Sequence, residues 1–170
     1  MNRRVWPWLF LAVGTGCGPG TEVAPIDFEL NVSAVLADRI SGLQVAFLQP
    51  QPADCGAVQT TCVVNQVPMD NFVGLVDDKG ISHKAVIFAL DLKSGTTPTQ
   101  DVKVTGIPPG KKYAVVIEAL SKADPPTLVG SSCNYVAEIV VGANPNKVAA
   151  TISAPLAAPA SYTCDPRIEK

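Results

Sequence analysis

The pattern of apolar and polar residues along the chain predicts short β-strands. Over residues 27–36, apolar positions alternate with polar ones, and Phe28, Leu30 and Val32 fall on one side. An alternation with a period of two is typical of a strand with one buried face. Comparable segments recur between turns rich in Pro and Gly, and we expect eight or nine strands, at residues 27–36, 42–48, 62–67, 72–76, 85–92, 101–107, 114–120, 135–141 and 147–153.

The spacing of these segments favours an all-β fold, in which residues 27–153 form a single β-sandwich of short antiparallel strands. A turn at residues 77–80, with the sequence Asp-Asp-Lys-Gly, is expected to join the segments 72–76 and 85–92. No helix is expected in this region. Residues 154–170 are rich in Pro and Ala and show no strand pattern, so we expect an irregular C-terminal tail. The hydrophobic fraction of 47% is too high for a disordered chain.

One turn narrows the fold class further. The stretch Ile107-Pro108-Pro109-Gly110-Lys111-Lys112-Tyr113 leads directly into the segment 114–120. A Pro-Pro-Gly turn followed by Tyr resembles the sandwich families typified by fibronectin type III, transthyretin-like and carboxypeptidase-regulatory-like domains. The resemblance implies an Ig-like or prealbumin-like sandwich with a structural corner at Pro109, Gly110 and Tyr113, where the tyrosine hydroxyl bonds to nearby backbone. It implies little about function, because such sandwiches have many roles.

The N-terminal region is organised like a signal peptide. Arg3 and Arg4 precede an apolar stretch of about nine residues, which is followed by small residues up to Cys17. The stretch is shorter than the ~20 apolar residues that a transmembrane helix needs. We therefore expect residues 1–16 to be a signal peptide and residues 17–26 to form a short tether.

Thr15-Gly16-Cys17 resembles the bacterial lipobox, although Gly14 stands where that motif usually has Leu. The resemblance implies that the Cys17 thiol is acylated with diacylglycerol and that the leader is cut off before it. In lipoproteins of Gram-negative bacteria, a residue other than Asp after the cysteine, here Gly18, is compatible with delivery to the outer membrane. An ordinary secretory signal, with Cys17 as a chance residue, is the alternative.

Charge argues against a nucleic-acid partner. Removal of the leader leaves 11 basic and 15 acidic residues, so the formal charge of the chain moves from −2 to −4. The remaining basic residues are scattered, and Lys111-Lys112 is their only adjacent pair. Binding to nucleic acid or to anionic lipid needs clustered Lys and Arg, so neither is expected.

Four cysteines remain once Cys17 is set aside, and in an exported chain these favour disulfides. The expected pairs are Cys55–Cys62, which closes a short local loop, and Cys133–Cys164, which holds the C-terminal tail against the sandwich. The crossed pairings remain open. We expect no metal site and no cofactor, because the cysteines lack the spacing of zinc knuckles and the chain has one histidine.

Residues with catalytic potential have simpler explanations. His83 has no accompanying Gly-x-Ser-x-Gly motif, so we expect it in an exposed loop. Asp77 and Asp78 suit a tight turn better than a calcium site, which needs six to eight oxygen ligands. Glu118 is expected to point outward from an alternating strand. The chain is therefore not expected to be an enzyme.

Together these features predict a lipoprotein of the cell envelope, held in the outer membrane through Cys17. Its domain is expected to be a non-catalytic structural or protein-interaction module that presents loops such as residues 121–132 to an envelope protein. The alternative is a ligand-binding module for envelope polysaccharide. Such a site would use exposed aromatic residues such as Tyr113, Tyr135 or Tyr162, since both tryptophans lie in the leader.

Overall fold

The computed structural model of the protein describes residues 25–32, 34–76, 79–89, 99–103, 107–140 and 146–152. Most of its regular elements are strands. They are β1 (Pro25–Val32), β2 (Ile40–Leu48), β3 (Leu75–Val76), β4 (Ser82–His83), β5 (Val86–Ala89), β6 (Thr99–Lys103), β7 (Tyr113–Ser121), β8 (Leu128–Val136) and β9 (Asn146–Ile152). The helical turns are α1 (Ala34–Ala37), η1 (Ala57–Thr60), α2 (Val63–Gln66) and η2 (Met69–Asn71).

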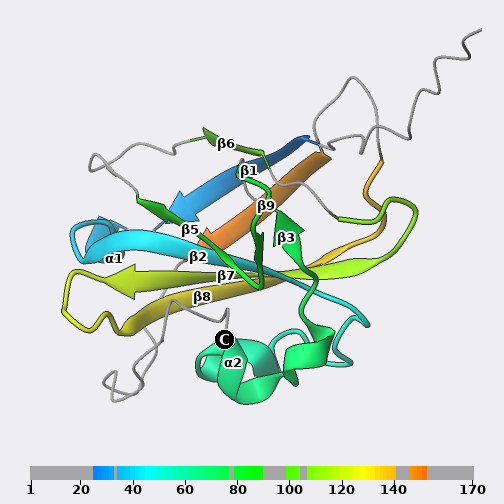
Figure 1. Ribbon diagram of the computed structural model, residues 1–170. Helices are drawn as coiled ribbons and strands as arrows, with labels where there is room; N and C mark the ends of the chain where they lie inside the picture. Colours follow the sequence, from blue (N-terminus) through cyan, green and yellow to red (C-terminus); the bar gives the residue numbers. More distant parts are fainter. Residues whose placement is uncertain are drawn as a thin grey trace, which may run out of the picture.

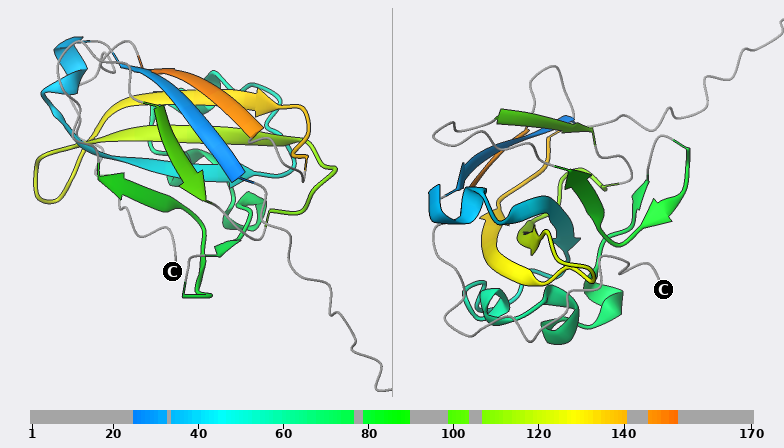
Figure 2. Two further views of the ribbon diagram at one scale, coloured as in Figure 1. Left: turned by 90° about the horizontal axis from the view of Figure 1, so that it is seen from above. Right: turned by 90° about the vertical axis from the view of Figure 1, so that its left-hand side faces the viewer.

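Two sheets lie face to face, as Figures 1 and 2 show. One has four strands in the order β5-β2-β7-β8, and the other has three in the order β6-β1-β9. The strands β3 and β4 form a separate small hairpin. The prediction of an all-β fold is confirmed.

The pairing of β1 with β9 departs from the expected antiparallel pattern. These two strands run parallel, with Ile26 opposite Asn146 and Val32 opposite Ile152, while the other pairs between named strands are antiparallel. Parallel neighbours cannot be joined by a tight hairpin and need a long connection. Here most of the chain separates the two strands, so the turn residues near either strand could not predict that the two strands pair.

Alternate residues of both sheets form the main apolar core between them. In β7, Val115, Ile117 and Ala119 point into this core, and β2 contributes residues two apart in the same way. The opposite sheet supplies its own buried side chains from β1 and β9, and the strand positions of the core are Ile26, Leu30, Leu43, Val45, Phe47, Val115, Ile117, Ala119, Val129, Val148, Ala150 and Ile152. The period-two alternation of β9 agrees with the sequence pattern, since its even-numbered residues from Val148 to Ile152 are buried and its odd-numbered ones are exposed.

The other face of the four-stranded sheet is also covered. Residues 49–72, which we call the cover segment, run through η1, α2 and η2 beneath this face (Figure 1). Their side chains form a second apolar cluster with alternate residues of β2 and β7, including Leu48, Ala114 and Val116. As a result, the first eight residues of β7 are buried without alternation.

Several element boundaries differ from those expected. Residues 62–67, predicted as a strand, contain the helical turn α2. Leu75–Val76 pairs with Ser82–His83 rather than with the later strand β5, which joins β2. The strand expected at 135–141 lies earlier, at Leu128–Val136, so much of the expected loop 121–132 is sheet.

The turn before β7 forms a tight corner that contains Gly110 and Tyr113. Gly110 has a φ of 70°, a left-handed conformation that Gly adopts without steric cost. The buried Tyr113 donates its hydroxyl hydrogen to the carbonyl oxygen of Pro108. Its ring also meets Phe47 edge to face, with ring centroids 6.5 Å apart. This corner fixes the start of β7, the strand that carries Glu118 and pairs with β8.

Candidate functional site

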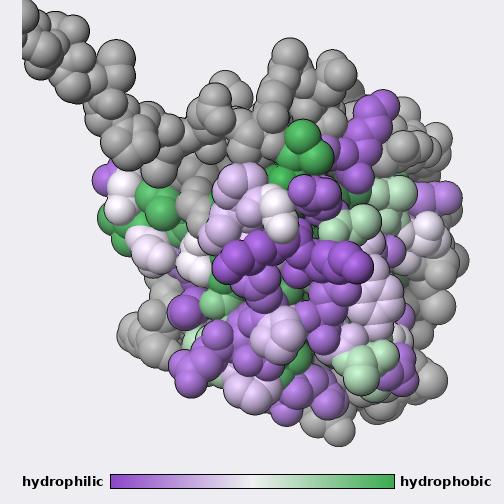
Figure 3. Space-filling model, turned by 90° about the vertical axis from the view of Figure 1, so that its right-hand side faces the viewer, coloured by the Kyte–Doolittle hydropathy of each residue, from purple (hydrophilic) through white to green (hydrophobic). Residues whose placement is uncertain are grey.

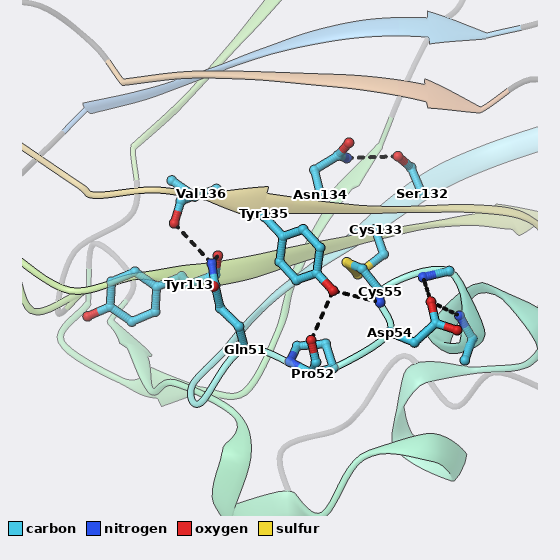
Figure 4. Close-up of a disulfide and its surroundings, with 12 residues drawn as sticks. Gln51, Pro52, Asp54, Cys55, Tyr113, Ser132, Cys133, Asn134, Tyr135 and Val136 are labelled. Carbon is cyan, nitrogen blue, oxygen red and sulfur yellow. Dashed lines mark hydrogen bonds between the residues drawn. A yellow bond between two sulfur atoms is a disulfide. The ribbon is translucent and has the colours of Figure 1, made fainter.

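A disulfide between Cys55 and Cys133 ties the cover segment to β8 (Figure 4). The Cα atoms of the two residues are 5.4 Å apart, and 78 positions separate them in sequence. The predicted pairs Cys55–Cys62 and Cys133–Cys164 are therefore wrong. Cys133 lies on the outer face of β8, opposite Val116, where Cys55 also packs, whereas Cys62 packs against Leu120 and Leu128 farther along the sheet.

Cys62 is itself disulfide-bonded. Its partner is neither Cys55 nor Cys133 and lies outside the described residues. Cys17 and Cys164 are the remaining cysteines of the chain, and both lie outside the described residues as well. The lipid attachment expected at Cys17 therefore falls outside the part of the chain that the structure describes.

Tyr135 connects β8 to the same part of the cover segment. Its hydroxyl accepts a hydrogen bond from the backbone N–H of Cys55 at 3.0 Å and donates to the carbonyl oxygen of Pro52 at 3.0 Å (Figure 4). Gln51 adds a further contact, because its Nε2 donates to the carbonyl oxygens of Tyr113 and Val136. These bonds hold the beginning of the cover segment on the end of β8, beside the disulfide.

A groove of about 600 Å³ lies where β8 and β9 face each other at one side of the sandwich. Its walls come from residues 134–138 and from residues 146–149. Tyr135 lines it and is 52% exposed, and the charged side chains of Glu138 and Lys147 are exposed as well. Among the described strands, β8 and β9 each pair with a single neighbour. Each is therefore an edge strand of its sheet, and the groove lies along these two edges.

Glu118 lies in the middle of β7 and points toward the cover segment. It is fully buried, contrary to the outward orientation expected from the sequence. One carboxyl oxygen accepts from the backbone N–H of Val63, the first residue of α2, and the other accepts from Gln44 Nε2 at 2.8 Å. Burial raises the pKa of Glu118 to about 7, and the two hydrogen bonds offset only part of that rise.

A sequence signal for this burial exists in β7. The residues from Ala114 to Leu120 are apolar at every position except Glu118. A continuous apolar run of this length is typical of a strand buried on both faces. Treating the run as an alternating strand therefore placed Glu118 in solvent. Gln44 and Ser131, the neighbours of Glu118 on the adjoining strands, carry no comparable signal, because they are common polar residues in ordinary strands.

The other residues with candidate roles are not brought together in one site within the described part of the chain. His83 lies on β4, opposite Leu75, and is only half-buried. Asp77, Asp78 and Tyr162 lie outside the described residues. Tyr113 is buried in the corner and is not available for stacking on a ligand, so Tyr135 is the tyrosine whose described position leaves much of its surface accessible.

The described residues contain no helix that is both long and apolar enough to cross a bilayer. They also contain no group of three or more His, Cys, Asp and Glu residues placed to hold a metal ion. One end of the sandwich, shown in Figure 3, presents mainly hydrophilic residues, with apolar residues scattered among them. Scattered apolar residues are normal for a protein surface and do not mark an interface.

Comparison of the chain with protein-family models, with curated proteins and with solved structures finds no match in any of the three.

Proposed function

We propose that this chain is a lipoprotein of the bacterial envelope, anchored through Cys17, whose β-sandwich binds another envelope component without catalysing a reaction. The observation that supports this proposal best is the use of the cysteines. Cys55, Cys62 and Cys133 are all in disulfides, and disulfides persist in oxidising compartments outside the cytoplasm. Export of the chain is also what its basic and apolar leader predicts.

The cysteine count links the lipid to the second disulfide. If Cys17 bears the lipid, Cys164 is the one cysteine left to pair with Cys62. If Cys17 bears none, it competes for that partner. Lipid attachment and the Cys62–Cys164 disulfide are therefore two consequences of the same proposal.

A non-reducing peptide map of the mature protein, combined with palmitate labelling, tests both consequences. We expect a peptide that links Cys62 to Cys164 and an acylated N-terminal Cys17. Labelling should be lost in Cys17→Ser and kept in Cys164→Ser, which is the matched control. A peptide that links Cys17 to Cys62 contradicts the proposal.

The side of the sandwich formed by β8 and β9 supports a role in protein interaction. Edge strands offer unpaired backbone N–H and C=O groups, which can pair with a strand of another protein. A pull-down with the soluble domain starting at Gly18 tests this role. Binding of an envelope protein that is lost when Thr151, an exposed residue of β9, is replaced by Pro supports it.

Polysaccharide binding is the second candidate, and Tyr135 is the observation that favours it. Its half-exposed aromatic ring lies at a groove and is a suitable platform for stacking a sugar ring. The exposed side chains of Glu138 and Lys147 in the same groove can bind the hydroxyl groups of the sugar. A glycan array with the wild type, Tyr135→Phe and Tyr135→Ala tests it. Saturable binding that survives Tyr135→Phe and is lost in Tyr135→Ala indicates ring stacking. Ile81→Ala, at another exposed apolar residue, is the control.

A further inference from the structure

Some neighbours of the buried acid Glu118 have buried side-chain oxygens of their own. Among the described residues, three buried side-chain oxygens have no hydrogen-bond partner: Gln44 Oε1, Thr61 Oγ1 and Ser131 Oγ. Gln44 and Ser131 are the direct neighbours of Glu118 on the two adjoining strands. Thr61 lies two positions before Val63, and the backbone N–H of Val63 donates to the Glu118 carboxyl. Buried unpartnered polar atoms are uncommon and call for an explanation.

No described element packed around Glu118 supplies a positive charge to balance a carboxylate. β2, β7, β8, η1 and α2 contain no Lys, Arg or His. The charged residues of the cover segment are Asp54 and Asp70, both acidic. Lys84 reaches only the far end of the segment, where its Nζ donates to the carbonyl oxygen of Phe72. A buried charge without a partner costs several kcal/mol, by the order of magnitude known for such groups.

The neutral acid suits these neighbours better. The amide nitrogen and the amide oxygen of Gln44 exchange places when the amide group turns by 180°. After that turn, a protonated Glu118 donates to Gln44 Oε1, and Val63 still donates to the other carboxyl oxygen. The neutral acid therefore keeps both of its hydrogen bonds and avoids the cost of a buried charge.

We propose that Glu118 is a pH-sensitive contact that controls how firmly the cover segment is held on the sheet. The neutral acid keeps α2 closed over β7. Ionisation favours an opened state in which water reaches the carboxylate, and the released proton passes to the solvent. The Cys55–Cys133 disulfide keeps the opened segment attached to β8. Opening uncovers the apolar outer row of the sheet, which includes Leu48, Ala114 and Val116.

Hydrogen–deuterium exchange of the oxidised protein between pH 5 and pH 9 tests this proposal. After correction for the intrinsic effect of pH on exchange, we expect exchange in η1 and α2 to rise by about tenfold or more across neutral pH. Exchange in the inner-core residues of β7 should not follow this rise. In Glu118→Gln, which has an uncharged side chain of the same shape, exchange in η1 and α2 should show no such rise.

Two controls isolate Glu118. Glu138→Gln removes an exposed carboxylate from the same sandwich, and His83→Asn removes the single histidine of the chain, the residue type that ordinarily titrates near neutral pH. Both variants should behave like the wild type. Carbon-detected NMR of the wild-type Glu118 carboxyl follows its ionisation directly, even if Glu118→Gln does not fold. Corrected exchange that is independent of pH, or a carboxyl already ionised at pH 5, overturns the proposal.

Discussion

The two faces of the four-stranded sheet are buried in different ways. The inner face meets the second sheet, and its side chains in β2 and β7 are all apolar. The outer face meets short helical turns and includes Gln44 and Glu118 between apolar neighbours. Strand alternation is enough to assemble the inner face. The outer face also uses a disulfide, the hydroxyl of Tyr135 and a buried carboxyl. We therefore expect the outer face to respond more strongly than the inner core to redox state and pH.

Of the changes that we predict for the outer face, loss of the Cys55–Cys133 disulfide should lower the free energy of unfolding most. The bond links residues 78 positions apart, and the chain-entropy model gives a stabilisation of about 4.5 kcal/mol for a loop of that size. The double variant Cys55→Ser, Cys133→Ser should lose that much in urea unfolding. In limited proteolysis of this variant, the cover segment should be cleaved earlier in time than β2 and β7 are. Cleavage that starts in the inner strands would contradict a separately held outer layer.

The pH dependence of stability should come next. The pKa of Glu118 is about 7 in the folded protein and lies near the ordinary 4.5 in the unfolded chain. The folded state therefore binds the proton more tightly, and its contribution to stability is complete below pH 4.5 and is lost as the pH rises through 7. The loss should reach about 3 kcal/mol.

Urea unfolding of the wild type and of Glu118→Gln from pH 4 to pH 9 measures this loss. The difference in unfolding free energy between the two should change in favour of the variant as the pH rises. A constant difference across this range would show that Glu118 has the same pKa in both states.

Two leucines of β2 allow a matched test of packing on the two faces. Leu43 faces the inner core and Leu48 faces the cover segment, and both are almost fully buried. Leu43→Ala should cost about 3 to 4 kcal/mol, and Leu48→Ala about 1 kcal/mol less, because short turns can settle into a cavity more easily than a paired sheet. Urea unfolding of both variants measures the difference. Equal costs would mean that the cover segment packs as rigidly as the second sheet.

Removal of one hydroxyl should have the smallest effect. Tyr135→Phe loses the bonds to Cys55 N–H and Pro52 O, and we expect a cost of about 0.5 to 1 kcal/mol. Faster exchange of the Cys55 amide should accompany it. Tyr113→Phe, which removes the corner bond to Pro108, is the control and should leave the Cys55 amide unchanged.

The sequence predicted the parts of this fold that depend on local pattern. The strands β2, β7 and β9 were located closely, and the Pro-Pro-Gly turn with Tyr113 marked the corner. The helical turn α2 was mistaken for a strand, because Val63, Val64 and Val67 favour strands by composition. At four residues, α2 is too short to show a helical repeat.

The amino-acid sequence by itself determined the all-β class and the period of the inner core, since both follow from residues that are close along the chain. Tertiary structure alone decided the parallel contact of β1 with β9, the joining of Cys55 to Cys133 and the burial of Glu118. Each of these features depends on a contact between two segments that lie far apart in the sequence. A local pattern can indicate that a residue is next to apolar neighbours, but only the packed chain determines which segment excludes water from it.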